Sequence, residues 1–239
     1  MKGVICVVFM ILPMFMWAYV EEITPDFATE EGIYAGGGGG FLIGGWLPSL
    51  DEVSSALFSA GYDSLPLWYM TTGGYGYGVL GKVIVGGEGM GFTQEFSTGD
   101  HRREVEAGFG AFDIGYIVVA SKSVLVYPFL GIGGGSISIR LTEQSTPVDF
   151  HNVLADPDLE ATLTTSVFLL SANLGMDWYL LFGDEEGGGG FILGIRGGYV
   201  FQPKEGQWTM GDIDVVNVPD VRLSGPYISF SIGMAGVAR

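Results

Sequence analysis

Apolar residues alternate with small or polar residues along three segments in the last part of the chain. At positions 167–182 the even residues are mostly bulky and apolar, whereas the odd residues at 171–177 are small or polar. Residues 191–201 and 227–235 repeat this alternation. A period of two residues is typical of a β-strand. We therefore predict three long strands that follow one another in antiparallel order.

The polar side of these strands consists mainly of Gly, Ser, Ala and Asn. A soluble sheet would place Lys, Glu and Thr on its exposed face. Small side chains suit the narrow interior of a barrel, and bulky apolar side chains suit a surface that faces lipid. The pattern therefore predicts an all-β, antiparallel up-and-down barrel whose apolar residues point outward.

Four earlier segments are also expected to be strands, although their alternation is less regular. They are residues 36–46, 73–92, 104–120 and 124–141, the second of which would bend in its middle. Barrels of bacterial outer membranes usually have an even number of strands. Residues 65–72 are the candidate for the missing strand, so we predict about eight strands, with ten as the alternative.

Asp113 does not fit the predicted alternation, because it falls on the face that would point outward. On that face the carboxylate would meet lipid, which disfavours charge. A β-bulge near Gly108 or Gly110 would turn the carboxylate inward.

The segments between the predicted strands differ in length at the two ends of the barrel. Residues 121–123 and 183–190 would connect strands at one end, and the longer residues 142–162 and 203–224 would connect them at the other. Outer-membrane barrels place short turns in the periplasm and long loops outside. The two longer segments are therefore predicted to be external.

One short helix is predicted near residues 50–60. Ser49 and Glu52 have the spacing of a capping box, apolar residues follow with helical spacing, and Gly61 would end the helix. The helix is too short to span a membrane. It would plug the lumen, lie at the rim of the barrel, or connect two strands without a further role.

Two charge pairs follow from the register of the predicted hairpins. Asp177 lies six residues before the loop at 183–190 and Arg196 six after it, so a symmetric hairpin places them directly opposite each other. The same reasoning across residues 121–123 places Glu104 opposite Arg140. We expect both to be structural ion pairs of the lumen, the second nearer to the external rim. A gate or a contact with a solute is the functional alternative for the first pair.

The chain begins with Lys2 and an apolar run that extends to Ala18. This is the organisation of a signal peptide, so we expect residues 1–18 to direct export and residues 19–239 to form a single barrel domain. An uncleaved membrane anchor is the alternative. The only cysteine, Cys6, lies inside the run, which leaves residues 19–239 without a thiol for disulfides or thiolate metal sites.

Charge and motifs argue against nucleic-acid and cofactor binding. The formal net charge is −17, whereas phosphate binding needs clustered Lys and Arg. Residues 76–81 match the dinucleotide pattern G-x-G-x-x-G, but residues 82–85 read as a strand where that motif needs a helix. With 41 Gly in the chain, a chance match is expected, and we predict no cofactor.

Metal binding and catalysis are not expected either. Two acidic clusters lack the spacing of a Ca²⁺-binding loop, which leaves weak Ca²⁺ or Mg²⁺ binding as an alternative; they are Asp156, Asp158 and Glu160, and Asp212, Asp214 and Asp220. The two histidines lie beside aspartates, in Asp100-His101 and Asp149-Phe150-His151. A hydrolytic site in the loops would use such pairs, but the chain lacks the G-x-S-x-G context of a serine nucleophile.

The long alternating strands, small inner residues and unequal loops resemble the small outer-membrane β-barrel proteins of bacteria. The resemblance covers most of residues 19–239 and is one of pattern. It implies location in the outer membrane, contact with the lipid bilayer, and a structural, surface-interaction or weak solute-binding role. A general porin is not expected, because eight strands leave little open lumen. The alternatives are a secreted soluble all-β binding protein, a narrow channel and a barrel hydrolase, and the oligomeric state is left open.

Overall fold

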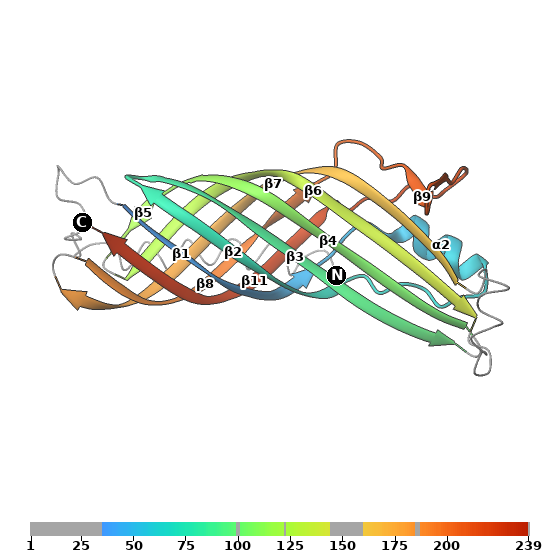
Figure 1. The fold of residues 1–239 in the computed structure, drawn as a ribbon, viewed down its shortest axis with the longest axis horizontal. Helices are drawn as coiled ribbons and strands as arrows, with labels where there is room; N and C mark the ends of the chain where they lie inside the picture. The colour runs from blue at the N-terminus through green and yellow to red at the C-terminus, as the bar shows by residue number, and fades with distance from the viewer. Residues whose placement is uncertain (1–34, 99–100, 122, 144–159, 185–186, 239) are drawn as a thin grey trace, which may run out of the picture.

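The fold is described from a computed structural model that covers residues 35–98, 101–121, 123–143, 160–184 and 187–238. Its elements, labelled in Figure 1, are β1 (Ala35–Trp46), α2 (Asp51–Ser59), β2 (Tyr69–Leu80), β3 (Val83–Thr98), β4 (His101–Tyr116), β5 (Val119–Ala120), β6 (Val124–Glu143), β7 (Glu160–Asp184), β8 (Gly187–Phe201), β9 (Trp208–Met210), β10 (Ile213–Asp214) and β11 (Gly225–Ala238). Residues 1–18, which we interpret as a signal peptide, lie outside the described part.

Eight long strands close into an antiparallel barrel. Their order around the wall is β1, β2, β3, β4, β6, β7, β8 and β11, and β11 pairs with β1 to close the ring. The connections β2–β3, β4–β6 and β7–β8 lie at one end, and the long segments that join β1 to β2, β6 to β7 and β8 to β11 lie at the other, together with the short connection from β3 to β4 (Figure 1). The predicted fold class, strand number and sorting of short and long connections are therefore confirmed.

The eighth strand is not where the sequence placed it. Residues 73–92 form two strands rather than one bent strand, because Leu80 pairs with Val83 across a two-residue turn. Gly81 has a φ of +61° in this turn, a conformation that glycine adopts readily and that tight hairpins require. Of the candidate strand at 65–72, only residues 69–72 are extended, and they begin β2.

The prediction that a bulge corrects Asp113 is wrong. Strand β4 keeps one continuous register with β3 and with β6, and its odd positions face the lumen throughout. Asp113 is therefore buried inside the barrel. What changes along β4 is the environment of its outer face, where Glu104 and Glu106 give way to Phe112 and Ile114. The polarity of a residue therefore does not tell, along the whole of β4, whether its side chain points inward or outward.

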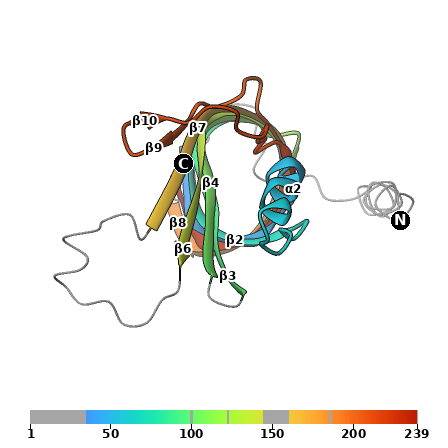
Figure 2. The ribbon, with the colours of Figure 1, turned by 90° about the vertical axis from the view of Figure 1, so that its right-hand side faces the viewer.

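Strands β3, β4, β6 and β7 extend further at the long-loop end than the other four. The 25 residues of β7 span about 80 Å along the strand, whereas about 9–11 residues cross a membrane. Residues 47–68, which we call the cap, and residues 202–224 stand where the short strands end (Figure 2). The hairpin β9–β10 pairs with β7 in this region.

The helix in the cap forms without the predicted capping box. Leu50 occupies the N-cap position and no side chain caps the helix, because Ser49 instead pairs with Arg222 through backbone hydrogen bonds. Val53 and Leu57 are the buried residues of α2, so the helix packs onto the mouth of the barrel rather than serving only as a connector. Among the described residues, no helix is long and apolar enough to cross a membrane.

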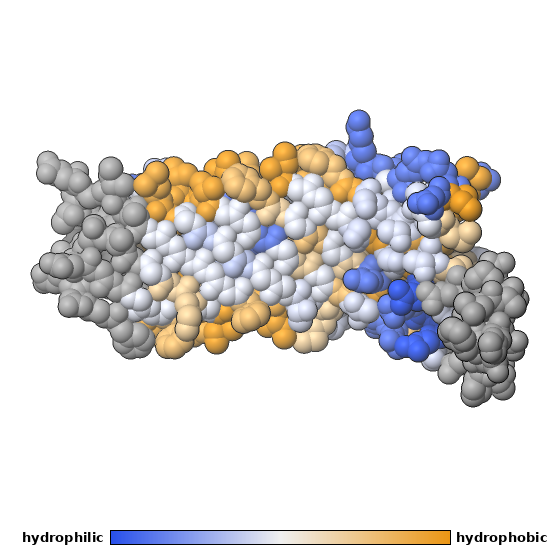
Figure 3. All heavy atoms as spheres, in the orientation of Figure 1, coloured by the Kyte–Doolittle hydropathy of each residue, from blue (hydrophilic) through white to orange (hydrophobic). Residues whose placement is uncertain are grey.

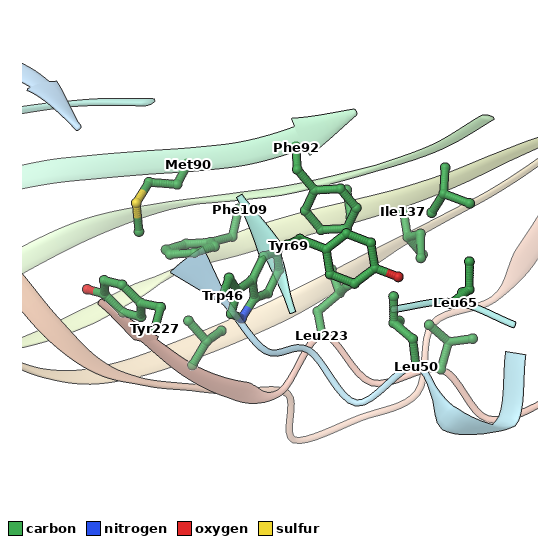
Figure 4. Close-up of a cluster of buried hydrophobic side chains, with 14 of the residues drawn as sticks. Trp46, Leu50, Leu65, Tyr69, Met90, Phe92, Phe109, Ile137, Leu223 and Tyr227 are labelled. Atoms are coloured by element: carbon green, nitrogen blue, oxygen red, sulfur yellow. The ribbon is translucent and has the colours of Figure 1, made fainter. Parts of the chain in front are cut away.

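An apolar core fills the lumen beneath the cap. Trp46, Tyr69, Phe92 and Phe109 pack together through ring contacts, with centroids of Tyr69 and Phe92 3.9 Å apart. Figure 4 shows this cluster with residues from the cap and from the 202–224 segment; they include Leu50, Leu65 and Leu223. The external half of the barrel is therefore filled like the interior of a soluble protein.

Arg103 fastens the cap to the four strands that extend furthest, β3, β4, β6 and β7, which we call the tall wall. Its guanidinium is buried, donates a hydrogen bond from Nη1 to the carbonyl oxygen of Asp63 at 2.7 Å, and lies 4.4 Å from the centroid of Phe96. Tyr62, also in the cap, lies on the same guanidinium at 5.9 Å. Such cation–π contacts strengthen when they are removed from water, so this residue joins β3, β4 and the cap.

We predict that Arg103→Ala loosens the cap, because it removes a buried hydrogen bond that is worth about 1–3 kcal/mol. The measurement is protease cleavage at residues 60–68 in the folded protein. Arg102→Ala is the matched control, since Arg102 makes only an exposed ion pair with Glu95, and such pairs contribute about 0–1 kcal/mol. Equal cleavage of the two variants would contradict the fastening role.

Candidate functional site

The outer surface of the barrel is apolar over most of its length. Figure 3 shows apolar residues along the upper and lower sides of the barrel body, with residues of intermediate hydropathy between them, and hydrophilic residues gathered towards the long-loop end. Large side chains that are exposed on this surface include Phe41, Leu130, Phe168, Leu174, Trp178, Leu193, Phe201, Phe230 and Met234. We call this surface the apolar belt. Water would not support so much exposed apolar surface, and a bilayer supports it only on a structure whose backbone hydrogen bonds are all internal. An apolar belt of this kind is typical of barrels that span a membrane.

Charged and tyrosine side chains meet inside the barrel, at the level of the belt. We call them the lumen cluster; its members are Tyr77, Glu88, Tyr127, Asp177, Tyr179, Arg196 and Tyr227. Arg196 on β8 lies at its centre, with Nη1 3.8 Å from Glu88 Oε2 and Nη2 3.6 Å from Asp177 Oδ2. The guanidinium also lies 3.6 Å from the ring centroid of Tyr75.

Tyrosine hydroxyls donate hydrogen bonds to one oxygen of each of the two carboxylates, whereas Glu88 Oε2 and Asp177 Oδ1 have no hydrogen-bond partner among the described residues. Tyr77 and Tyr127 donate hydrogen bonds to Asp177 Oδ2 at 2.7 and 2.8 Å. Tyr227 donates a hydrogen bond to Glu88 Oε1, and the hydroxyls of Tyr77 and Tyr179 are hydrogen-bonded to each other. Hydrogen bonds to charged groups are about twice as strong as neutral ones, so the cluster is a connected network rather than one pair.

The network joins opposite walls of the barrel. Glu88 on β3 and Arg196 on β8 are four strands apart in either direction around the eight-strand ring. Tyr77 on β2 and Asp177 on β7 are opposite in the same way. The lumen is therefore crossed by two contacts that run in different directions at one level.

Glycines on neighbouring strands make room for these large side chains. A Cβ atom at Gly194, which pairs with Asp177, would lie 2.2 Å from Asp177 Oδ1. One at Gly175, which pairs with Arg196, would lie 2.5 Å from the Tyr127 ring. The small inner residues are thus recesses in the wall, occupied by side chains from other strands.

The cluster has more acidic than basic groups. Three buried carboxylates, Glu88, Asp113 and Asp177, share the lumen with the guanidinium of Arg196. Both ion pairs of Arg196 go to Glu88 and Asp177, and Asp113 Oδ1 has no hydrogen-bond partner among the described residues. Buried charges without partners are costly, so the surplus of carboxylates around Arg196 makes this part of the lumen favourable for positive charge.

The structure brings Asp177 and Arg196 together, but in a different register from the one expected. Asp177 pairs with Gly194, and Arg196 pairs with Gly175, because β7 extends to residue 184 and β8 extends further, to residue 187, so the turn is centred earlier in the chain than the expected loop at 183–190. The two residues are diagonal neighbours, and the length of the arginine side chain closes the gap. The role expected for them, a structural ion pair of the lumen, stays a proposal.

Glu104 and Arg140 are directly opposite each other, with Oε1 and Nη1 3.6 Å apart. They lie at even positions of β4 and β6, however, and even positions of these strands face outward. The expectation that this pair lines the lumen is therefore wrong. It lies on the outer surface of the tall wall, where such pairs contribute little.

Sequence reasoning missed Glu88, the inner tyrosines and Arg103. Glu88 is a single charge within a glycine-rich run, and it shares parity with Ile84, Met90 and Phe92. An isolated charge on the same face as apolar residues was the available signal. It could be used only after residues 73–92 had been divided into two strands.

The other candidate residues do not form a site among the described residues. No group of three or more His, Cys, Asp or Glu side chains there could hold a metal ion. Asp220 Oδ2 accepts a hydrogen bond from Arg222 Nε at 2.9 Å, and Asp212 and Asp214 are exposed. Residues 76–81 form the end of β2 and its turn into β3, without the helix that a dinucleotide motif needs.

Several candidate residues of the predicted long loops lie where the structure does not describe the chain. Asp100, Asp149, His151, Asp156 and Asp158 lie outside the described part. His101 begins β4 and pairs through its backbone with Thr98 and Glu143, and Glu160 begins β7.

No protein-family model and no curated protein matches the chain. Among solved structures, it is similar to the attachment invasion locus protein Ail of Yersinia pestis, with 10% identity over 87% of this chain and 99% of Ail, and a TM-score of 0.41. It is also similar to the outer membrane protein OprG of Pseudomonas aeruginosa, with 12% identity over 90% and 99% of the chains and a TM-score of 0.40. The outer membrane protease OmpT of Escherichia coli matches at 10% identity over 92% and 98%, with a TM-score of 0.28.

The predicted resemblance to outer-membrane barrels is thus found again among solved structures. Identities and TM-scores this low say nothing about shared activity.

We predict that Arg196→Met is strongly destabilising, because it leaves Glu88 and Asp177 buried without their cation, a loss of about 3–5 kcal/mol. Adding Asp177→Asn and Glu88→Gln should recover part of the loss. Urea unfolding in lipid vesicles of the wild type, Arg196→Met, the double variant Asp177→Asn, Glu88→Gln, and the triple variant measures the coupling between Arg196 and its two carboxylates. Arg140→Met on the outer surface is the control. Purely additive effects would show that the network does not act as a unit.

Proposed function

We propose that this protein is an outer-membrane β-barrel with a closed lumen, which has a structural or surface-interaction role rather than that of a general porin. The observation that carries the proposal is the lumen cluster, whose contacts cross the barrel between opposite walls at the level of the apolar belt. A solute could pass this level only by displacing buried, mutually bonded charges.

Packing on both sides of the cluster supports the same conclusion. Towards the short-turn end, Ile84, Ile117, Tyr127 and Phe129 form an apolar group inside the barrel. Towards the long-loop end, the larger core around Trp46 extends up to the cap. Barrels of eight strands have interiors that side chains are just able to fill, so the filled lumen agrees with the strand number.

The location in the outer membrane rests on three features. The belt fits a lipid environment, the signal-like residues 1–18 fit export, and the sorting of short turns and long loops fits the orientation of outer-membrane barrels. In this orientation the cap and the tall wall face the exterior of the cell. Binding of a small solute or of a cell-surface partner would take place at this end, where the chain presents its charged residues.

A secreted soluble protein is disfavoured by the belt, because a soluble surface rarely exposes apolar patches beyond a few hundred Å². A hydrolytic role is not part of the proposal.

We predict that the purified protein produces no large, steady conductance in planar bilayers, because the lumen cluster and the two apolar groups obstruct the path. A general porin measured in the same bilayers is the positive control. Folding is checked in parallel by recovery in the membrane fraction and by a change in gel mobility on boiling. Steady porin-like conductance would overturn the closed lumen, and a soluble protein with unchanged mobility would overturn the membrane location.

A further inference from the structure

The cap leaves the barrel at two points, and both carry exposed apolar side chains on the outside. Leu47 follows β1, whereas Leu67 and Trp68 precede β2. Their exposed fractions are 43%, 75% and 58%. We call these three residues the cap roots. In a soluble rim such residues would be unfavourable, so their surroundings need an explanation.

The cap roots continue the apolar belt. The Trp68 ring lies on the outer side of β1, where a Cβ atom at Gly45 would be 3.4 Å from its Cε3 atom. Met70, the next outward residue of β2, and Ile228, on the strand that pairs with β1, are exposed members of the same surface. The surface that faces lipid therefore extends without a break from the strands onto the start and end of the cap.

The opposite side of the cap is buried in the lumen core. Leu50, Val53, Leu57 and Leu65 all belong to the cluster that also contains Trp46 and Tyr69. The cap is thus apolar on its inner side along its length, and its exposed large apolar residues other than Phe58 are the cap roots. The exposed face of α2 is mainly polar or small, with Phe58 as the exception.

We infer that lipid of the external leaflet is the second partner of the cap: the cap roots insert into the membrane interface and hold the cap closed over the lumen. This inference rests on the proposed membrane location. Lipid is favoured as the occupant because the roots are continuous with the belt, and because tryptophan prefers the boundary between headgroups and acyl chains. A second copy of the chain at the roots is the competing occupant.

Quenching of tryptophan fluorescence by brominated lipids tests the contact. Wild type, Trp68→Phe and Trp178→Phe are compared in vesicles of phosphatidylcholine brominated near the headgroup. Trp46 and Trp208 are buried inside the protein and should add little quenching. We expect that each of the two substitutions removes a share of the quenchable emission.

Trp178 lies in the belt, so its quenching distinguishes failure of this inference from failure of the proposed membrane location. If Trp178 is quenched and Trp68 is not, the inference is overturned while the membrane location stands. If neither is quenched, the proposed location itself fails. An unquenched Trp68 in a cross-linkable dimer would assign the roots to a second copy instead.

Hydrogen exchange of α2 tests whether lipid contact holds the cap. The double variant Leu67→Ser, Trp68→Ser should exchange the amides of α2 several-fold faster than wild type in vesicles. Phe112→Ser is the matched control, since it removes an exposed aromatic side chain from the outer face of β4, away from the cap, and it should leave the exchange of α2 unchanged. Unchanged exchange in a double variant whose gel mobility shows a folded barrel would refute the holding role. If the double variant does not fold, the quenching of wild-type Trp68 still decides the contact.

Discussion

The buried guanidinium of Arg196 is the constraint on which the interior of the barrel depends. It enters the lumen from β8 at a level where the wall outside is apolar, so its charge must be met from within the barrel. No single neighbour meets it: Glu88 comes from the opposite wall and Asp177 from the adjacent strand. The tyrosines from β2, β6 and β11 then donate hydrogen bonds to one oxygen of each carboxylate, Asp177 Oδ2 and Glu88 Oε1. One charge thereby sets the relative positions of strands that do not pair, which backbone hydrogen bonds alone cannot do.

This arrangement explains the distribution of small residues. Each large polar side chain needs a place on the facing or adjacent strand, and glycine is the residue that leaves it, as Gly194 does for Asp177 and Gly175 for Tyr127. Glycine weakens a strand, because it loses more conformational freedom on folding than other residues. In this barrel the loss is offset by interior contacts that span the lumen. A wall rich in glycine therefore indicates a filled barrel here, not an open one.

The alternation of residues along the sequence predicted the strands and the barrel. It did not predict contacts that depend on strands distant in the chain. The alternation at 167–182, 191–201 and 227–235 was sufficient for the strands, for their lipid-facing side and for the barrel itself. It could not resolve the hairpin at Gly81, because glycines on both sides of that turn carry no polarity signal. The register depends on where the turn is centred, which the glycine-rich loop does not reveal: a turn centred on 183–190 predicts Asp177 opposite Arg196, whereas they are diagonal neighbours. Glu88 was missed because its partners, Arg196 and Tyr227, lie more than a hundred residues away in the chain.

Asp113 shows how the two halves of the barrel differ. Within the belt, strands have apolar outer faces and a polar lumen. Beyond it, the same strands have charged outer faces, with Glu104 and Arg140, and an apolar inner face, with Val105 and Ile139. The odd residues of β4 face the lumen along the whole strand. In the proposed membrane location, only the environment outside the barrel changes, from lipid to water. A wall that leaves the membrane must bury its apolar residues on the inside, and an apolar inside needs a cover. The cap is thus required by the height of β3, β4, β6 and β7, and a barrel that ended at the edge of the belt would have no use for it.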